Sequence, residues 1–326
     1  MREITYREAI REAMREEMRR DETVFQLGED IGRNFGGAFK VTAGLGEEFG
    51  DARILNTPLA EAGIVGVAVG SALVGMRPIA EIMYMDFTTL AIDIILNTMS
   101  KIRFMTGGMV KMPVVVRTQQ GGRGVSGATH SQSLEAMFMH IPGLIVILPS
   151  TPRDAKGLLK SAIREDNPVI FIEHKGLYAM KGPVSAEEYL IPLGKAEIKR
   201  EGRDITVVAI SRSVLRALEA AEKLEEEDIH LEVIDPMTIK PLDEETIISS
   251  VQKTGRLMVV HEACKTGGFG AEVAAIVSEK AIDYLDAPIK RVAALDAPIP
   301  CGEVFENFVL PGVDDIIHAS RKLIGK

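Results

Sequence analysis

Short apolar runs alternate with helical repeats along the first half of the chain, and this alternation predicts βα units around a largely parallel sheet. A capping box formed by Thr5 and Glu8 predicts a helix that begins just after it. Further helices are predicted at 61–73 and at 87–104, the second closed by Gly107-Gly108, and Thr151-Pro152 opens another. The predicted strands are residues 24–27, 78–83, 113–118, 144–148 and 169–173.

The periodicity lapses between residues 177 and 203, and a second alternating block follows. The elements predicted in that block are strands at 205–210, 230–234, 257–261 and 289–293, and helices at 214–226, 243–253 and 270–282. We therefore predict two α/β domains with mostly parallel sheets, residues 1–185 and 204–326, joined by a linker at 186–203.

The 326-residue chain has a formal net charge of -9, with 46% hydrophobic and 26% charged residues. An acidic chain is a poor match for nucleic acid, whose binding needs a basic face, but it leaves room for a basic protein partner. The longest apolar run, residues 62–76, is shorter than the roughly 20 residues that a membrane span needs. We expect a buried helix there and no membrane partner.

Cys264 and Cys301 are the two cysteines, and their wide separation supports neither a disulfide framework nor a zinc site. A reducing, cytoplasmic location is the expectation. Because the capping box at Thr5 lies so near the first residue, we also expect no cleaved targeting peptide.

Gly66 and Gly70 lie four residues apart in the helix predicted at 61–73 and leave a smooth groove on one face. Such a groove lets a second backbone approach closely. Two interpretations stay open, which are tight packing inside the chain and packing across a subunit boundary.

Glu61 is a single carboxylate at the start of that otherwise apolar helix. Burial disfavours the charged form of a carboxylate, so such a group can share a proton with a bound nitrogen base. The simpler alternative is that Glu61 lies in the first helical turn and complements the helix dipole by roughly 0.3–1 kcal/mol.

The glycine-rich stretch at 121–127 follows a predicted strand, yet it leads into Ala128-Thr129-His130 rather than into a helix. It therefore does not match a dinucleotide-binding fingerprint, and no nucleotide-binding P-loop is present. A loop of this kind can cradle an anion or bring a ligand close to the backbone, which by itself defines no function.

A series of motifs resembles, in order, the beta subunits of thiamine diphosphate-dependent 2-oxo acid dehydrogenases. The resemblance runs essentially from one end of the chain to the other. The motifs are Gly28-Glu29-Asp30, Asn56-Thr57-Pro58-Leu59-Ala60-Glu61, Thr129-His130-Ser131-Gln132, Pro142-Gly143-Leu144, Asp154-Ala155-Lys156-Gly157-Leu158, Asn167-Pro168-Val169, Glu173-His174-Lys175, residues 235–243 and Asp286-Ala287-Pro288.

This resemblance implies a pyrimidine-binding, transketolase-like domain, a transketolase C-terminal-like domain, and half of an active site. The first domain would hold the aminopyrimidine ring of thiamine diphosphate, while an alpha subunit would hold the diphosphate and its Mg²⁺. In agreement, Gly50-Asp51-Ala52 lacks the third glycine of the diphosphate-binding signature. The implied assembly is a heterotetramer of two alpha and two beta chains.

By motif, Glu61 would hydrogen-bond the pyrimidine ring nitrogen, and Phe87 would stack on the ring. Glu29 would lie between two active sites and relay protons, and His130 would face the reacting carbon. Histidine suits that role because its charge changes near pH 7. The structural alternatives are a core aromatic at Phe87, an exposed loop carboxylate at Glu29 and a surface histidine at His130.

Some members of the family bind K⁺ through backbone oxygens around the end of a helix. By position, the resemblance assigns these oxygens to Val114, Ala162, Ile163, Glu165 and Asn167. Carbonyl ligation leaves little trace in a sequence, because any residue type supplies the oxygen.

The implied activity is oxidoreductase chemistry, in which a 2-oxo acid such as pyruvate is decarboxylated and the acyl group passes to the lipoyl group of an acyltransferase component. The basic binding module of that component would dock on the second domain. Acetoin cleavage is the alternative substrate reaction, followed by branched-chain 2-oxo acids, and residues 175–178 look closer to the pyruvate and acetoin members. Two rival functions are a non-catalytic assembly subunit and a self-contained transketolase-like enzyme.

Overall fold

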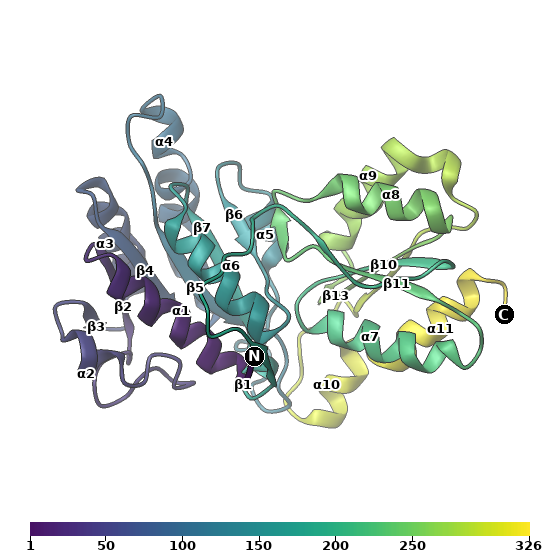
Figure 1. Cartoon of the computed structure of the whole chain (residues 1–326), viewed down its shortest axis with the longest axis horizontal. Helices are drawn as coiled ribbons and strands as arrows, with labels where there is room; N and C mark the ends of the chain where they lie inside the picture. Colours follow the sequence, from purple (N-terminus) through teal and green to yellow (C-terminus); the bar gives the residue numbers. More distant parts are fainter. The chain divides into compact units, whose positions relative to one another are not determined.

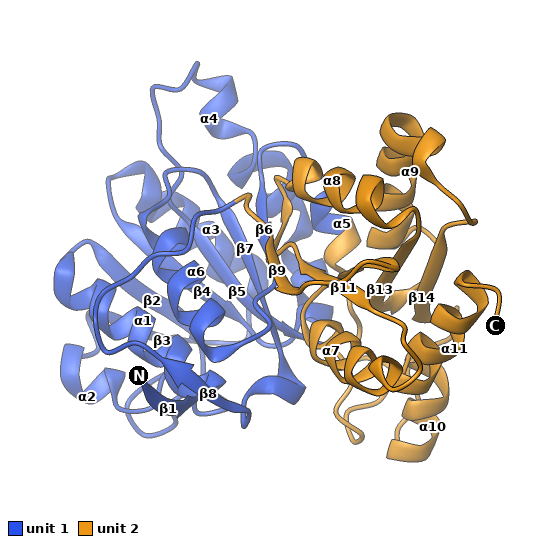
Figure 2. Ribbon diagram, turned by 45° about the vertical axis from the view of Figure 1, so that its right-hand side comes forward, with its two compact units in different colours: residues 1–120, 137–193 blue, residues 121–136, 194–326 orange.

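The computed structural model describes all 326 residues, which divide into two compact units (Figures 1 and 2). Unit 1 comprises residues 1–120 and 137–193, and unit 2 comprises residues 121–136 and 194–326. The change at residue 193 lies inside the predicted linker, whereas the inclusion of 121–136 in unit 2 was not predicted. Sequence patterning divides a chain into contiguous pieces, so it misses a loop that packs with a distant segment.

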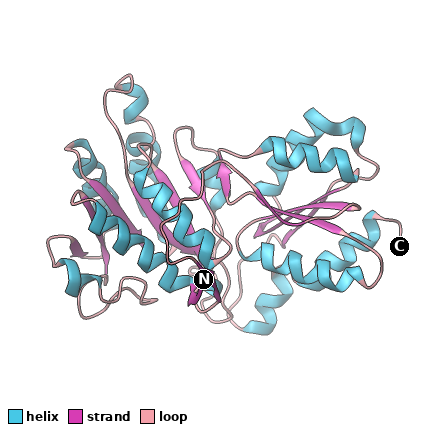
Figure 3. Ribbon diagram, in the orientation of Figure 1, coloured by secondary structure: helices cyan, strands magenta, loops and turns pink.

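Unit 1 is built on parallel strands in the order β6-β7-β5-β4-β2-β3, with helices beside them (Figure 3). Their parallel pairing confirms the predicted α/β class. A further antiparallel pair joins β1 (Arg2–Thr5) to β8 (Lys181–Val184). The parallel strands are β2 (Val24–Glu29), β3 (Ile54–Thr57), β4 (Arg77–Ile82), β5 (Val115–Gln120), β6 (Ile145–Ile147) and β7 (Val169–His174).

The helices around this sheet begin where the sequence provides caps. The Thr5 hydroxyl accepts a hydrogen bond from the Glu8 N–H and Thr151 accepts one from the Asp154 N–H, as predicted. Helix α3 begins at Glu61 with no side-chain cap. The helices are α1 (Tyr6–Arg20), α2 (Leu45–Phe49), α3 (Glu61–Leu73), α4 (Ile102–Met105), α5 (Glu135–Met139) and α6 (Pro152–Arg164), with a 3-10 turn η3 (Lys175–Leu177).

The single helix predicted at 87–104 is wrong, because the segment forms three short pieces. These are the 3-10 helix η1 (Met85–Ala91), the π-helix η2 (Ile94–Met99) and α4. The hydroxyls of Thr88, Thr89 and Ser100 each donate to a carbonyl three or four residues earlier, and such bonds compete with the regular ladder. Gly107-Gly108 ends α4 in the left-handed conformation, as predicted.

Unit 2 contains a five-stranded sheet in the order β14-β13-β10-β11-β9. All neighbours are parallel except β9, a charged edge strand that lies within the predicted linker and is antiparallel to β11. Its strands are β9 (Glu197–Arg200), β10 (Ile205–Ala209), β11 (Leu231–Asp235), β13 (Leu257–Cys264) and β14 (Lys290–Ala294), and a short strand β12 spans Thr238–Lys240. Its helices are α7 (Arg212–Glu225), α8 (Glu244–Thr254), α9 (Phe269–Ala281), η4 (Ile282–Tyr284), α10 (Glu303–Val309) and α11 (Val313–Leu323).

None of these helices combines the length and the apolar character that crossing a lipid bilayer requires. Cys264 and Cys301 are both exposed, and neither forms a disulfide. The predicted apolar run at 62–76 is mostly the half-buried helix α3.

A fully buried guanidinium joins three strands at the centre of the unit 1 sheet. Arg117 on β5 donates from Nη1 to Glu81 Oε2 on β4 (2.8 Å) and from Nε to Glu173 Oε1 on β7 (2.7 Å). The Tyr178 hydroxyl donates to the other Glu173 oxygen (2.6 Å). Burial raises the pKa of Glu173, and the positive charge of Arg117 opposes that shift. The buried negative charges of Glu81 and Glu173 are therefore both balanced by the Arg117 guanidinium.

We expect Arg117→Met to lower the free energy of unfolding by about 3–5 kcal/mol, because it leaves two buried carboxylates without their cation. Thermal and urea unfolding followed by circular dichroism measure this loss. Arg19→Met removes an exposed ion pair to Glu48 and serves as the control, with an expected change below about 1 kcal/mol. Equal changes in the two variants would contradict the role given to Arg117.

Candidate active site

Glu61 is the first residue of α3, where the chain turns from β3 into the helix, as the sequence predicts. Its side chain is only 9% exposed, and its carboxylate makes no hydrogen bond to another residue of the chain. The free N–H groups of a first helical turn favour a negative charge there. An acceptor is thus held at the mouth of an apolar helix with no partner from its own chain.

Glu29 ends the neighbouring strand β2, paired in register with Thr57 on β3. It is buried, and its Oε1 atom has no hydrogen-bond partner. Burial, followed by the negative charges of Glu61, Asp30 and Glu81, raises the pKa of Glu29 to about 7. Glu29 is therefore a buried acid that exchanges a proton near neutral pH and not an exposed loop carboxylate.

Phe87 lies on η1, the element that packs against α3. Its side chain is half-buried, and its ring centroid is 6.4 Å from that of Tyr84. Tyr84 in turn contacts Phe39 edge to face at 5.6 Å. Phe87 thus belongs to a row of aromatic rings and keeps part of its surface exposed.

His130 belongs to unit 2, in contrast to Glu29, Glu61 and Phe87, which unit 1 contains. It lies in the glycine-rich loop 121–136, half-buried, with Nδ1 3.1 Å from the Thr129 hydroxyl. Gly124 and Gly127 in this loop have left-handed φ angles of 83° and 69°, which other residues rarely adopt. The loop passes through these turns to α5, so it does not form the strand-to-helix phosphate loop of nucleotide-binding proteins.

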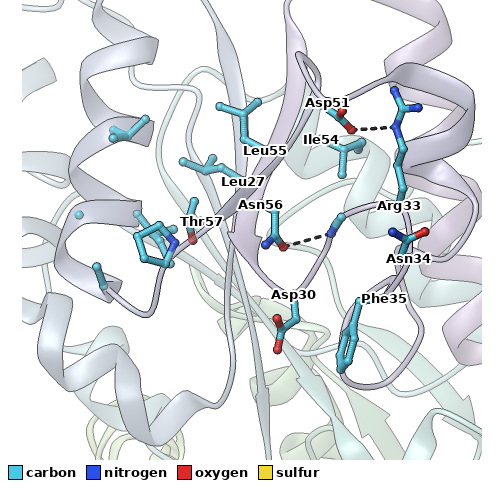
Figure 4. A pocket seen from close by; sticks show the side chains of 16 residues that line it. Leu27, Asp30, Arg33, Asn34, Phe35, Asp51, Ile54, Leu55, Asn56 and Thr57 are labelled. Carbon is cyan, nitrogen blue, oxygen red and sulfur yellow. Dashed lines mark hydrogen bonds and ion pairs between the residues drawn. The ribbon is translucent and has the colours of Figure 1, made fainter.

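A cavity of about 760 Å³ opens at the carboxyl ends of β2 and β3 (Figure 4). Asn56 Oδ1 accepts the Gly32 N–H at 3.2 Å, and Arg33 pairs with Asp51 at 2.8 Å. Sequence reasoning did not select these residues, although ligands of parallel sheets gather at this edge. Glu29 and Glu61 do not line the cavity, whose walls include Leu27, Asp30, Leu55, Thr57, Ala60, Gly63, Ile64 and Val67.

Four of the five residues expected to offer oxygens to K⁺ lie at the end of α6 and in the turn towards β7, and the fifth, Val114, precedes β5 and accepts the Val169 N–H. The five are Val114, Ala162, Ile163, Glu165 and Asn167. Arg77 donates to the carbonyl oxygens of Ile163 (2.8 Å) and Glu165 (2.6 Å). A carbonyl oxygen has a second lone pair, so a bound K⁺ ion would share these two oxygens with the guanidinium.

Comparison with protein families defines the class of protein. Residues 2–181 match the transketolase pyrimidine-binding domain, and residues 194–316 match the transketolase C-terminal domain. The solved structure described as "Split gene transketolase, inactive beta4 tetramer" has the same fold, with a TM-score of 0.82 and 26% identity over 99% of this chain and 98% of that one. The chain is thus a two-domain α/β protein of the transketolase type.

Curated relatives narrow the class. The 2-oxoisovalerate dehydrogenase subunit beta of Bacillus subtilis is 49% identical over 99% of both chains. The acetoin:2,6-dichlorophenolindophenol oxidoreductase subunit beta of the same organism is 45% identical over 100% of this chain and 98% of its own. The pyruvate dehydrogenase E1 component subunit beta of Rickettsia conorii is 47% identical over 98% of both. The chain belongs to the family of E1 beta subunits of 2-oxo acid dehydrogenases.

This membership confirms the family and the fold class that the motifs indicated. The three relatives are named for three different substrates at similar identity, so the family is defined more sharply than the substrate. A pyrimidine-binding domain fits the residues at hand, since Glu61 offers an acceptor without an intrachain partner and Phe87 an accessible ring.

The raised pKa of Glu29 makes its folding contribution pH-dependent. A carboxyl whose folded pKa lies above its unfolded value stabilises the fold at low pH, and this contribution is lost as the pH rises through about 7. We therefore expect Glu29→Gln to unfold about 2–4 °C above the wild type at pH 8, with the difference vanishing towards pH 5. Differential scanning calorimetry at both pH values measures it.

Glu22→Gln provides the matched control for Glu29→Gln. Glu22 precedes the same strand and is exposed, so its substitution should leave the melting temperature unchanged at both pH values. An identical offset for Glu29→Gln at pH 5 and pH 8 would contradict the raised pKa.

Proposed function

We propose that this chain is the beta subunit of a thiamine diphosphate-dependent 2-oxo acid dehydrogenase that decarboxylates pyruvate and passes the acyl group to the lipoyl group of an acyltransferase component. The observation that carries the proposal is the Glu61 carboxylate, which is held at the start of α3 beside Glu29 with no partner from its own chain. A non-catalytic assembly subunit would not require such an arrangement, because two neighbouring acids destabilise the fold.

Glu61, Phe87 and Glu29 are the residues that would receive the aminopyrimidine end of the cofactor. When bound, thiamine diphosphate supplies the cleavage of the carbon–carbon bond next to the substrate carbonyl. Because Glu29 and Glu61 repel each other when both are charged, a proton on Glu29 leaves Glu61 as the acceptor for a ring N–H. The half-exposed Phe87 offers a face for the ring, and His130 would serve as the proton donor to the reacting group.

An alpha subunit completes this proposal. In the chain, no cluster of three or more His, Cys, Asp or Glu side chains is arranged to hold a metal ion. The diphosphate and its Mg²⁺ would accordingly be bound by the alpha chain, in a heterotetramer of two alpha and two beta subunits. The K⁺ site at the end of α6 remains part of the proposal as a structural ion.

The exposed face of α3 supports a subunit contact there. A Cβ atom added at Gly70 would meet no atom within 4 Å, and Val67 on the same face is 52% exposed. A Cβ atom added at Gly66 would meet only the Ile94 side chain, at an ordinary contact distance of 3.6 Å. The glycines of α3 are thus not needed for packing inside the chain, which favours the interface interpretation.

Residues 175–178, which suggested the pyruvate and acetoin members, serve the interior of unit 1. Tyr178 bonds Glu173, and the Lys175 ammonium lies 5.0 Å from the centre of the Tyr84 ring. These contacts do not rank the substrates, so the order from the sequence is kept, with acetoin as the second candidate and 2-oxoisovalerate as the third. The co-expressed heterotetramer, assayed with pyruvate, acetoin and 2-oxoisovalerate in the presence of a lipoyl domain, decides among them. A preference for either of the last two would overturn the pyruvate assignment.

We expect Glu61→Ala to lower turnover by about 10²–10⁴-fold, because it removes the acceptor of the cofactor ring proton. Fold and assembly should be retained, as judged by circular dichroism and gel filtration. Glu245→Ala is the matched control: Glu245 also lies in a first helical turn, that of α8, but is exposed. Turnover of Glu61→Ala within tenfold of wild type would rule out the assignment and leave the helix-dipole role.

Gly70→Leu should separate folding from assembly. In an exposed helix interior, leucine is favoured over glycine by up to about 1 kcal/mol, so the isolated chain should become slightly more stable. The added side chain should at the same time prevent close approach of the alpha subunit, which gel filtration of the co-expressed chains detects. Glu222→Leu on the exposed face of α7 is the control and should leave assembly intact. Normal assembly of Gly70→Leu would exclude this face as the contact.

A further inference from the structure

Two buried carboxylates of unit 2 hold the backbone of the loop that carries His130. The Gly122 N–H donates to Glu262 Oε1 (2.9 Å), and Glu262 lies on β13. The Gly124 N–H donates to both carboxylate oxygens of Glu306 (2.8 Å each), which α10 carries. Glu262 is 6% exposed and Glu306 is 4% exposed.

The loop is fitted closely to these acids. A Cβ atom at Gly122 would lie 2.5 Å from Glu306 Oε1, so the Glu306 side chain would have to shift to admit it. The Arg212 guanidinium reaches the Gly122 carbonyl at 3.5 Å, and the Cys301 thiol reaches the Val125 carbonyl at 3.7 Å. Contacts from β13, from the start of α7, from α10 and from Cys301 just before α10 therefore meet on the four loop residues 122–125.

A hydrogen-bonded turn passes this restraint on to His130. The His130 N–H approaches the Gly127 carbonyl at 3.4 Å, so the histidine backbone is tied to a residue two positions beyond the restrained segment. A buried carboxylate is costly unless its charge is compensated. The positive charge of Arg216, 3.8 Å from Glu262, acts on both acids, and the two carboxylate oxygens of Glu306 both accept the Gly124 N–H. Burying the loop would not by itself require a carboxylate at the Gly124 N–H. The buried Glu306 is therefore a costlier contact than cover for the loop demands.

We propose that Glu306, assisted by Glu262, is a positioning residue that places His130 for reaction. The inference rests on the proposed function of His130. It assigns Glu306 no contact with substrate, and its effect on turnover is exerted through the position of the loop. A displacement of about 1 Å in a catalytic group can reduce the rate by roughly 10²-fold.

The test is a double-mutant cycle in the assembled heterotetramer. His130→Ala, Glu306→Ala and the double variant are compared in reductive acylation of a lipoyl domain, with kcat and KM measured separately. We expect Glu306→Ala to lower kcat by at least about tenfold with KM for the 2-oxo acid changed by less than about twofold. The double variant should be no slower than His130→Ala, because both changes remove the same function.

Two further variants sharpen this cycle. Glu306→Gln keeps one oxygen that can accept the Gly124 N–H, so it should recover most of the lost kcat. Asn307→Ala, on the exposed side of the same helix, is the matched control and should behave as wild type. Hydrogen exchange of the peptide containing residues 121–130 gives a readout apart from activity, and it should become faster in Glu306→Ala only.

The outcomes distinguish this inference from the proposed function. Full activity of His130→Ala would remove the proposed role of the histidine, whatever Glu306 does. Reduced activity of His130→Ala together with unchanged kcat in Glu306→Ala would overturn the positioning role alone. Multiplicative losses in the double variant, or unchanged hydrogen exchange in Glu306→Ala, would overturn it as well. If Glu306→Ala fails to assemble, the Glu306→Gln cycle and its exchange rates decide by the same criteria.

Discussion

The buried ion pairs of Arg117 are the interaction on which the architecture of unit 1 depends. One guanidinium binds Glu81 and Glu173, so β4, β5 and β7 cannot shift in register without exposing a charge to the apolar interior. The carboxyl ends of the neighbouring strands β2 and β3 then lie side by side. That alignment brings Glu29 and the start of α3 together.

The site that results is defined by negative charge without a cation. Burial raises the pKa of Glu29, and the negative charge of Glu61 raises it further. Pairs of neighbouring carboxylates occur at functional sites, where a bound cation reduces their repulsion. A protonated nitrogen heterocycle is such a cation. Unit 2 also contains buried acids, since Glu306 and Glu262 accept hydrogen bonds from the backbone of a glycine-rich loop. In both units, buried carboxylates, which are energetically costly, lie at or near the predicted functional residues.

Local sequence signals predicted the elements whose formation depends on neighbours in the chain. The caps at Thr5 and Thr151 and the apolar runs of every parallel strand except β3 were predicted, because capping and burial leave a periodic trace. The segment 85–105 was misread because threonine and serine hydroxyls rival the backbone ladder without disturbing the apolar spacing. Strands β1, β3, β8, β9 and β12 were not predicted, and the pairing of β1, β3, β8 and β9 is with residues distant in the chain.

The sequence by itself determined the fold class and the family, since motifs in fixed order carry this information, and it predicted Glu61, Glu29, Phe87 and His130 as site residues. Only the tertiary structure decided that Arg117 joins three strands, that Glu29 is buried beside Glu61, and that residues 121–136 pack with unit 2. The physical reason is the same in each case: charges and hydrogen bonds act between atoms close in space, and residues 32 to 182 positions apart in the chain supply the partners.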